Sequence, residues 1–405
     1  MVGFYIGTKK VEISWQNFRP SVVVSNKEPL PSLTNLDFSL FWNVWQNLEG
    51  SFYDKSKIDH QKMLNGAIEG MVQSLEDPFT VYLPLSQNES FKQGLAGQFS
   101  GIGAELGTKD NQIIVIAPLD GSPAQRSGII AGDKILKVDG QLSANWSLST
   151  AVEKIRGPQG TKVTLNIMHK DSEEAEDILI TRDIITIKSV IGWVKKIREI
   201  EGIKSTKSIK GKEDYKVSYI RLSQFGDSTN RDWLSLANEF DLKMQRDPAI
   251  KGFILDLRNN PGGYLTDAVF IASEFLKHGE TVVKQEGSEN TEVSAVTRQG
   301  LFLEIPLVVL INKGSASASE IVAAAVSDNK RGTLIGETSF GKGTIQQAYD
   351  LGNGAGVHIT VAKWLTPKGT WVNGEGIKPD IEVSLDEKDP ERDLQLEKAV
   401  EELVK

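Results

Sequence analysis

Two short, largely apolar runs constrain the fold of this chain more than any other feature. Phe253–Leu257 and Pro306–Ile311 have the length and composition of strands that are covered on both faces of a parallel sheet. A helical pattern follows each run, over 264–278 and 317–328. A further strand is expected over the alternating segment 357–365. The second half of the chain is therefore predicted to be an α/β core built from strand–helix–strand units.

The rest of the sequence suggests three further parts. At 405 residues, with 39% hydrophobic and 25% charged side chains, the chain has the size and composition of a soluble protein of two or three domains. Apolar residues at helical spacing predict helices over 33–75, and short strands with glycine-rich turns begin near residue 96. We therefore expect a multidomain protein of mixed α+β and α/β class, with a helical N-terminal segment (1–95), a compact mixed module (96–184), the α/β core (185–389) and a C-terminal helix (390–405).

The charge balance argues against nucleic acid as a partner. The chain has 46 basic and 54 acidic side chains, and its net charge of -8 repels a phosphate backbone. The lysine-rich stretch 195–214 is expected to be a solvated hairpin or loop rather than a binding patch.

Cysteine and histidine usage narrows the possible chemistry. The chain has no cysteine, which excludes disulfides, thiolate zinc sites and a cysteine nucleophile. No two histidines have the spacing of a metal-ligand pair, and we expect all four to be surface or packing residues: His60, His169, His278 and His358. A catalytic triad that depends on histidine is therefore disfavoured.

The first ten residues, MVGFYIGTKK, hold a short apolar run followed by lysines. This run is far shorter than the roughly 20 residues that a membrane-spanning helix needs. Two interpretations stay open, a terminal strand or the end of an anchor helix that lies upstream.

Ser317 is a candidate nucleophile because of its place in the segment 312–332, NKGSASASEIVAAAVSDNKRG. There a buried strand leads through small residues into a helix, and in α/β sheets such a turn exposes side chains at the edge where ligands bind. A structural interpretation is also open, since Ser317 and Glu320 fit the S-x-x-E capping box at a helix start. On this segment alone the capping role is favoured.

Lys342 shifts the balance toward catalysis. It stands between two glycines in the segment 336–346, GETSFGKGTIQ, and glycine adds no bulk around the ammonium. A serine hydroxyl needs a group that takes its proton, and a lysine amine can take it where burial lowers the pKa of the amine. Lys342 could therefore do for Ser317 what a histidine does elsewhere.

The same segment contains a near match to a phosphate-binding loop. Gly336–Lys342 fits the pattern G-x-x-x-x-G-K, but Gly343 occupies the place of the Ser or Thr that holds magnesium, and Thr344 comes one position late. A nucleotide-binding protein is kept as a weaker alternative.

A third segment, 254–264 (ILDLRNNPGGY), ends a predicted strand in Pro-Gly-Gly. Two glycines at a strand-to-helix junction can direct backbone N–H groups at an anion, as acyl transfer requires for its tetrahedral intermediate. A tight turn with a proline at the helix start explains the same residues without any function.

Together these segments resemble the carboxyl-terminal processing peptidases, or tail-specific proteases, a family of serine peptidases. The resemblance rests on three motifs in the order and spacing of the family: LDLRNNPGG (255–263), GSASASE (314–320) and FGKGTIQ (340–346). It extends to YIRLSQF (219–225), to the module at 96–184 and to the closing helix, so it covers nearly everything after residue 35. It implies a crotonase-like α/β peptidase core and hydrolysis of peptide bonds through an acyl-enzyme. It also implies that no metal or nucleotide cofactor is required.

By position, the resemblance implies Ser317 as nucleophile, Lys342 as general base and Gln346 as the residue that orients the lysine. The oxyanion hole would use two backbone N–H groups, from Ala318 and from either Gly262 or Gly263.

Asp328 also falls where family members carry an acid. Eleven helical residues at about 1.5 Å each would place it roughly 16 Å along the axis from Ser317. We therefore expect Asp328 to pair with Arg331 or a nearby turn instead.

The module at 96–184 resembles a PDZ domain, because SGIGAEL (100–106) is followed by SPAQRSGIIAGDKILKVDG (122–140). The resemblance implies a loop whose N–H groups hold a terminal carboxylate while the next strand pairs with the peptide, formed by Gly101, Ile102, Gly103 and Ala104. A structural spacer domain is the weaker alternative. Arg156 could sense the bound tail or the core, or be a solvated arginine at a helix end.

The sequence thus predicts a serine endopeptidase that cuts polypeptides near their C-termini and binds apolar C-terminal tails through its PDZ domain, which is also a candidate gate. The resemblance further implies a bacterial cell-envelope location, periplasmic or anchored to the membrane upstream. A homodimer is expected, to which the C-terminal helix would contribute. The alternative from another class is a catalytically silent PDZ scaffold.

Overall fold

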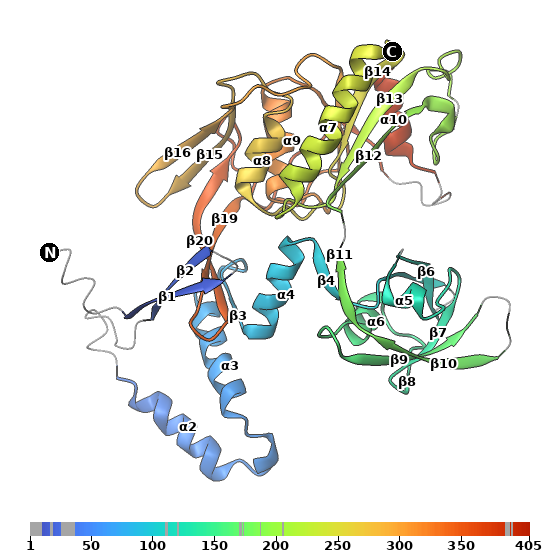
Figure 1. Cartoon of the computed structure of the whole chain (residues 1–405). Helices are drawn as coiled ribbons and strands as arrows, with labels where there is room; N and C mark the ends of the chain where they lie inside the picture. The colour runs from blue at the N-terminus through green and yellow to red at the C-terminus, as the bar shows by residue number, and fades with distance from the viewer. Residues whose placement is uncertain are drawn as a thin grey trace. The chain divides into compact units, whose positions relative to one another are not determined.

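A computed structural model of the chain describes residues 10–16, 19–25, 37–109, 112–119, 121–169, 172, 174–186, 188–204, 206–384, 389 and 392–405 (Figure 1). The chain divides into two compact units. Unit 1 comprises Met1–Lys92, Gly192–Ser223 and Ala237–Lys405, and unit 2 comprises Gln93–Ile191 and Gln224–Leu236. The expectation for the first nine residues lies outside the described residues.

The main sheet of unit 1 confirms the predicted α/β core. Its strand order is β12-β13-β14-β17-β18-β21, and the pairs from β13 to β21 are all parallel. The two apolar runs form the adjacent strands β14 (Ile250–Asp256) and β17 (Leu307–Ile311), and every residue of β17 is buried. The other strands are β12 (Val190–Lys196), β13 (Lys216–Leu222), β18 (Thr333–Gly336) and β21 (Ile381–Glu382).

Helices pack on this sheet and on one another. They are α7 (Thr229–Arg246), α8 (Leu265–Ala272), α9 (Ala318–Asp328) and α10 (Leu394–Leu403). The helix α8 lies against α9, which also contacts β18, and α10 packs on β14, β17 and β18 (Figure 1). The apolar face of α10 is therefore used within unit 1, where Leu396, Ala399 and Val400 join the core around Leu310.

A buried ionic cluster fixes the end of β14 to the start of α10. Arg258 donates to Asp256 at 2.6 Å and to Asp393 at 2.8 Å, and Asp256 is wholly buried. Tyr219 donates its hydroxyl to the same carboxylate at 2.7 Å, and burial together with the negative charge of Asp256 raises the pKa of Tyr219. Because this cluster anchors Arg258, it also fixes the turn that follows, residues 259–263.

A second sheet of unit 1 has the order β16-β15-β20-β19, with β3 added beside β20. Its strands are β3 (Val81–Leu83), β15 (Thr281–Gly287), β16 (Thr291–Ala295), β19 (Thr344–Asp350) and β20 (Gly356–Leu365). The strand β3 runs antiparallel to β20, with Tyr82 opposite Val357. The N-terminal part of the chain thus supplies one strand to the sheet that holds β19.

The N-terminal helices confirm the helical expectation over most of 33–75. They are α2 (Ser39–Ser51), the short 3-10 helix η2 (Lys55–Lys57) and α3 (His60–Gln73), and residues 33–36 lie outside the described part of the chain. A hairpin of β1 (Lys10–Gln16) and β2 (Arg19–Ser25) precedes them, and α4 (Leu85–Leu95) follows β3. No residue of α2 is buried. Among the described residues, no helix is long and apolar enough to span a membrane.

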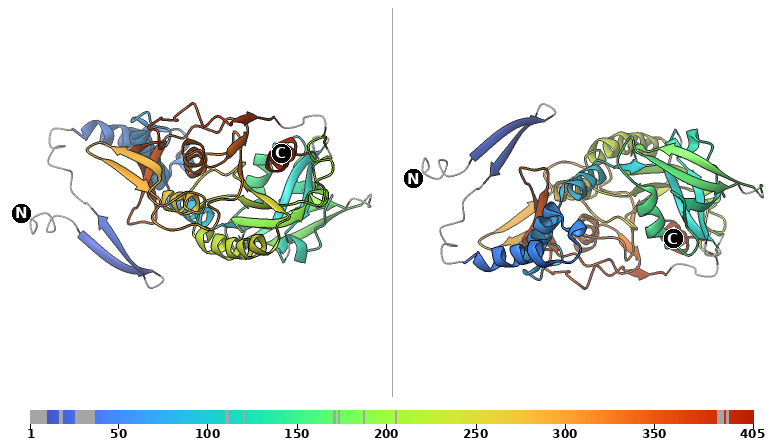
Figure 2. Two further views of the ribbon diagram at one scale, coloured as in Figure 1. Left: turned by 90° about the horizontal axis from the view of Figure 1, so that it is seen from above. Right: turned by 90° about the horizontal axis from the view of Figure 1, so that it is seen from below.

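The mixed module of unit 2 has a sheet with the order β10-β9-β7-β6-β5, in which β5 is an edge strand. Its strands are drawn in cyan to green in Figure 2. The elements are β4 (Gln98–Gly101), β5 (Ala104–Lys109), β6 (Gln112–Pro118), α5 (Pro123–Arg126), β7 (Lys134–Val138), β8 (Gln141–Leu142), α6 (Leu148–Ile155), β9 (Lys162–Met168), β10 (Ala175–Thr181) and β11 (Asp183–Thr186). Aliphatic side chains from β6, β7, β9 and both helices form its core.

The expectation of a solvated stretch at 195–214 is only partly correct. The strand β12 continues to Lys196, a 3-10 helix η3 spans Ile197–Glu199, and the remaining described residues form turns. Isoleucines between the lysines, among them Ile197 and Ile209, are buried in the core that includes α10. The sequence interpretation missed the burial of these isoleucines because of the high lysine content. Lysines can stay solvated while their apolar neighbours pack in the core.

Candidate active site

Ser317 occupies a strained turn at the start of α9. Its φ of 53° and ψ of -113° lie outside the conformations that a non-glycine residue normally adopts. Ser317 and Glu320 stand in the expected capping-box arrangement, and Glu320 Oε2 accepts from Ser317 N at 2.7 Å. The Ser317 hydroxyl itself closes no capping hydrogen bond.

Gly262 packs directly against this turn. A Cβ on Gly262 would lie 2.8 Å from Ser317 Cβ and 3.0 Å from Ala318 N, and the φ of Gly262 is 100°. Its own N–H donates to Asn260 Oδ1 at 2.9 Å. The N–H group of Ala318, by contrast, has no acceptor among the described residues.

Asn260 is a positioning residue that the sequence interpretation missed. It is wholly buried, and its Nδ2 donates to Leu222 O at 2.7 Å. Its carbonyl oxygen accepts from Ser319 Oγ at 2.9 Å and from Ala316 N at 3.0 Å. Asn260 thus ties the Pro-Gly-Gly turn to β13 and to the start of α9. In the sequence, the only signal was an asparagine directly before Pro-Gly-Gly at the end of a predicted strand.

The Glu320 carboxylate joins the turn at Ser317 to the loop of residues 339–342. We call these two segments the serine turn and the lysine loop. This wholly buried side chain accepts four hydrogen bonds, one of them from Ser317 N. The other three donors belong to the lysine loop: Ser339 Oγ at 2.6 Å, Gly341 N at 2.6 Å and Lys342 N at 2.9 Å. Ser317 N and Lys342 N share one carboxylate oxygen, so the two predicted catalytic residues are brought together through their main chains.

The main chain of Lys342 is fixed on both sides. Its carbonyl accepts from Trp364 Nε1 at 2.7 Å. The two flanking glycines allow this close packing, because a Cβ on Gly341 would lie 2.8 Å from Gly376 N, and one on Gly343 would lie 2.6 Å from Trp371 Nε1. Residues with a Cβ at these two positions would clash with the neighbouring main chain and the Trp371 ring.

The Lys342 amine lies in an environment suited to a base. Burial lowers the pKa of Lys342, while the carboxylates of Asp77 and Glu320 act in the opposite direction. Its Nζ lies 5.0 Å from the centroid of the Phe79 ring. Neither Asp77 nor Phe79 was singled out from the sequence, because they lie more than 200 residues before Lys342 and have no recognised spacing to it.

Gln346 lies on β19, four positions after Lys342. Its Nε2 donates to Thr344 Oγ1 at 2.9 Å and to Thr360 Oγ1 at 3.1 Å. Within the described residues, no hydrogen bond joins the side chains of Ser317, Lys342 and Gln346 to one another. Their assigned roles stay predictions from the resemblance.

The phosphate-binding alternative loses support, and one of the two partners expected for Asp328 is found. The glycine-lysine segment leads into the strand β19, whereas a phosphate-binding loop leads into a helix whose N-terminus holds the phosphate. Asp328 accepts from Lys368 N at 2.9 Å and pairs with Lys368 Nζ at 3.5 Å, so its partner is a turn rather than Arg331. Arg331 instead donates to the carbonyl oxygens of Phe275, Phe302 and Ile305.

The histidines lie in different surroundings, and the described residues contain no cluster that could hold a metal ion. His60 pairs with Glu49, and His169 bridges Asp133 and Glu176. His358 on β20 is buried, and burial and the charge of Lys342 lower its pKa. His358 is therefore a neighbour of the lysine loop and is neutral at ordinary pH.

In unit 2, the predicted carboxylate loop connects β4 to β5. Gly103 has a φ of 73°, and a Cβ there would lie 2.5 Å from Ser122 Cβ, so the loop requires glycine. The N–H groups of Ile102 and Gly103 have no acceptor among the described residues. The guanidinium of Arg156 lies 5.0 Å from the centroid of the Phe99 ring on β4, so this arginine packs on the strand that leads into the loop.

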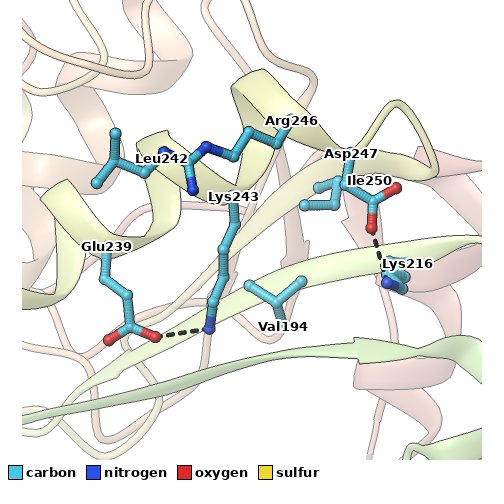
Figure 3. A pocket seen from close by; sticks show the side chains of 8 residues that line it. All are labelled: Val194, Lys216, Glu239, Leu242, Lys243, Arg246, Asp247 and Ile250. Carbon is cyan, nitrogen blue, oxygen red and sulfur yellow. Dashed lines mark hydrogen bonds and ion pairs between the residues drawn. The ribbon is translucent and has the colours of Figure 1, made fainter.

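A depression of about 470 Å³ in unit 1 lies apart from these residues (Figure 3). It is lined by Val194, Lys216, Glu239, Leu242, Lys243, Arg246, Asp247 and Ile250. Four of its charged side chains form two ion pairs, Glu239 with Lys243 at 2.6 Å and Lys216 with Asp247 at 2.7 Å. It contains none of the predicted catalytic residues.

The fold and the site define a serine peptidase that carries a PDZ domain. Three family models match the chain: Peptidase family S41 over residues 216–383, PDZ domain over 90–168, and the N-terminal domain of the activating protease CtpB over 3–86. The chain belongs to the carboxy-terminal processing proteases of family S41, which confirms the resemblance seen in the sequence.

Relatives support this assignment along most of the chain. The carboxy-terminal processing protease CtpA of Bacillus subtilis is 34% identical over 342 residues, which are 84% of this chain and 68% of the relative. A carboxy-terminal-processing protease of Bartonella bacilliformis is 39% identical, over 80% of this chain and 70% of the relative. The solved photosystem II D1 C-terminal processing protease is 29% identical with a TM-score of 0.52, and the alignment covers 85% of this chain and 92% of that one.

We predict that Glu320→Gln lowers both stability and turnover. The amide would keep one acceptor oxygen and turn an NH2 group toward N–H donors, and each buried donor left unpaired costs roughly 1–3 kcal/mol. Thermal unfolding and peptidase assays on the same preparation measure the two effects.

The matched control is Glu337→Gln, because the ion pair of Glu337 within the described part of the chain is with the exposed Lys313, at 3.6 Å. Such a pair contributes about 0–1 kcal/mol, so this variant should behave like the wild type. If Glu320→Gln also behaved like the wild type, the carboxylate would not organise the site.

Proposed function

We propose that the protein hydrolyses peptide bonds with Ser317 as nucleophile and Lys342 as general base. The observation that carries this proposal is the Glu320 carboxylate, which accepts from the main chain of both residues and joins the strained turn at Ser317 to the loop of the half-buried Lys342. A buried lysine with a lowered pKa can be neutral where a solvated one would be charged. A silent PDZ scaffold would not need this arrangement.

The reaction begins when neutral Lys342 Nζ takes the proton of Ser317 Oγ as that oxygen bonds to the substrate carbonyl carbon. The C–N bond then breaks, the amine leaves with the proton from Lys342, and an ester on Ser317 remains. Water attacks this ester, with Lys342 again accepting a proton and returning it to Ser317 Oγ. The products are a free acid, a free amine and the unchanged enzyme.

The tetrahedral oxyanion would be held by the N–H groups of Ala318 and Gly263. The N–H group of Ala318 has no acceptor among the described residues, and that of Gly262 is occupied by Asn260, which leaves Gly263 as the second donor. Gly262 would serve instead as the residue that allows close packing against Ser317. Of the two glycines that the sequence left open, the proposal therefore selects Gly263.

Gln346 would orient the base through its side-chain oxygen. The Nε2 group is occupied by Thr344 and Thr360, which fixes the amide plane. The amide oxygen accepts no hydrogen bond among the described residues and can accept one from Lys342 Nζ.

We predict that Ser317→Ala and Lys342→Ala each abolish turnover and that the double variant is scarcely slower than either. Because Lys342 must be neutral to accept a proton, activity should rise with pH through its lowered pKa and level off above it. Steady-state kinetics with a quenched reporter peptide at several pH values measures both effects.

Lys313 is exposed and lies four residues before Ser317, so it provides the control. Lys313→Ala should keep wild-type turnover. His358→Gln should keep the same pH profile. Substantial activity in Lys342→Ala, or loss of the pH dependence in His358→Gln, would show that another group is the base.

We further propose that unit 2 captures the C-terminal tail of the substrate. Among the described strands, the edge strand β5 pairs with β6 alone, so an extended peptide can add beside it. The available N–H groups of Ile102 and Gly103 would bind the terminal carboxylate, and Ala104 starts the strand that pairs with the peptide. Gly101 leads into this loop, where Arg156 could report that a tail is bound.

Peptides with apolar C-termini should bind this module and accelerate cleavage of a separate reporter. Their amidated forms should bind about tenfold or more weakly, because charge-assisted hydrogen bonds worth roughly 1.5–3 kcal/mol are lost. Fluorescence anisotropy measures binding, and a peptidase assay measures activation.

Arg156→Gln should reduce the activation, while the control Lys154→Gln, at an exposed position on α6, should not. Equal binding of free-acid and amidated peptides would contradict tail reading. If tail peptides activated Arg156→Gln and Lys154→Gln equally, Arg156 would have no role in coupling tail binding to activity.

The homodimer and the envelope location are also proposals. We assign the dimer contact to α2 rather than α10, because Trp42 is 55% and Leu48 is 44% exposed while the apolar face of α10 is buried. Sedimentation velocity should show a dimer that Trp42→Glu converts to a monomer. A monomeric wild type would contradict the proposed dimer.

The extracytoplasmic location, with an anchor upstream, rests on the resemblance alone. Recovery of the native protein with the cytosol would contradict this location.

A further inference from the structure

The turn at residues 77–80 (DPFT), between α3 and β3, has a strongly determined conformation. Thr80 N donates to Asp77 O at 3.2 Å. The Asp77 carboxylate accepts from Phe79 N at 3.1 Å and from Thr80 Oγ1 at 2.6 Å. Aspartate at the first position and proline at the second are the residues that favour such a turn. We call residues 77–80 the DPFT turn.

The DPFT turn is joined to the strand that faces Gln346. Thr80 is buried, and its Oγ1 accepts from Thr360 N at 3.0 Å. The next residue, Val81, is paired with His358 on β20. Thr360 Oγ1 in turn accepts from Gln346 Nε2 at 3.1 Å, so hydrogen bonds lead from the turn to the residue proposed to orient the base.

Lys342 Nζ lies against the same turn. The ring of Phe79 is 5.0 Å from Nζ, and no described residue accepts a hydrogen bond from Nζ. Two carboxylates act on this amine, Asp77 from the DPFT turn and Glu320 from α9, and the charge of Lys342 lowers the pKa of His358 on β20. Hydrogen bonds from Thr360, Thr80 and Phe79 N hold the pKa of Asp77 below its usual value although burial raises it, so this carboxylate is charged.

Proton transfer from Ser317 turns the buried amine into an ammonium. Burial opposes that charge, whereas a carboxylate and the face of an aromatic ring stabilise it. The turn therefore supplies what the transition state needs after the proton has moved, and it is already fixed before the reaction starts.

We propose that Asp77 and Phe79 are positioning residues of the peptidase, which hold Lys342 Nζ in place and stabilise its ammonium form during proton transfer. This inference rests on the Ser317–Lys342 function proposed above.

The test is the variant Asp77→Asn, which keeps an oxygen for Phe79 N and removes the negative charge. Loss of that charge lowers the pKa of Lys342 further, so the acid limb of the kcat/KM profile should move to lower pH by on the order of one unit. The alkaline plateau of kcat should fall roughly tenfold, because a weaker and less well-held base accepts the proton less readily. KM should stay nearly unchanged.

Phosphonylation of Ser317 provides a second readout that needs no peptide turnover. The pH midpoint of its rate should shift in the same direction in Asp77→Asn. Phe79→Leu, which keeps apolar cover but removes the ring, should show a smaller shift of the same sign. Asp59→Asn is the matched control, because Asp59 caps α3 through Lys62 N and asparagine caps equally well.

The outcomes separate this inference from the proposed function. If Ser317→Ala and Lys342→Ala are inactive but Asp77→Asn and Phe79→Leu keep the wild-type midpoint in both assays, the DPFT turn has no such role and the dyad stands. The proposed role of the DPFT turn is also contradicted if these variants lose activity only in proportion to a lowered melting temperature, while the pH midpoint stays at the wild-type value. Activity in Lys342→Ala overturns the dyad itself, whatever Asp77→Asn does.

Discussion

The geometry of the site depends on one buried carboxylate. Glu320 accepts from Ser317 N at the start of α9 and from three donors in the loop that ends at Lys342. The serine turn follows a strand of the main parallel sheet, and the lysine loop leads into a strand of the second sheet. A single side chain thus sets the main-chain positions of two residues that come from different sheets. The four donors also satisfy a charge that would otherwise be costly to bury.

Opposing influences set the protonation of Lys342. Burial disfavours the ammonium, and the carboxylates of Asp77 and Glu320 favour it. A base must be neutral before the reaction and charged in the middle of it, so neither influence alone would suit catalysis. The apolar ring of Phe79 excludes water on one side without providing a hydrogen-bond acceptor that would keep the proton on the lysine.

Much of the fold follows from local patterns, and part of the site does not. The apolar runs at 253–257 and 306–311 predicted the central strands, because burial on both faces leaves few other sequences possible. The motifs around Ser317 and Lys342 were visible because small residues are required there by close packing. Asn260 and the DPFT turn were missed, since their roles come from contacts with residues distant in the chain. Burial of the isoleucines among the lysines of 195–214 likewise depends on α10, which lies far along the sequence.

The antiparallel pairing of β3 with β20 means that the stretch matched by the peptidase family model is not a self-contained folding unit. Without residues 77–83, β20 would expose backbone groups at a new sheet edge, and such edges invite association with other chains. The N-terminal segment and the catalytic core therefore share one sheet. Chimeras within this family should exchange them as one block, whereas the PDZ module, with its own sheet and hydrophobic core, can vary more independently.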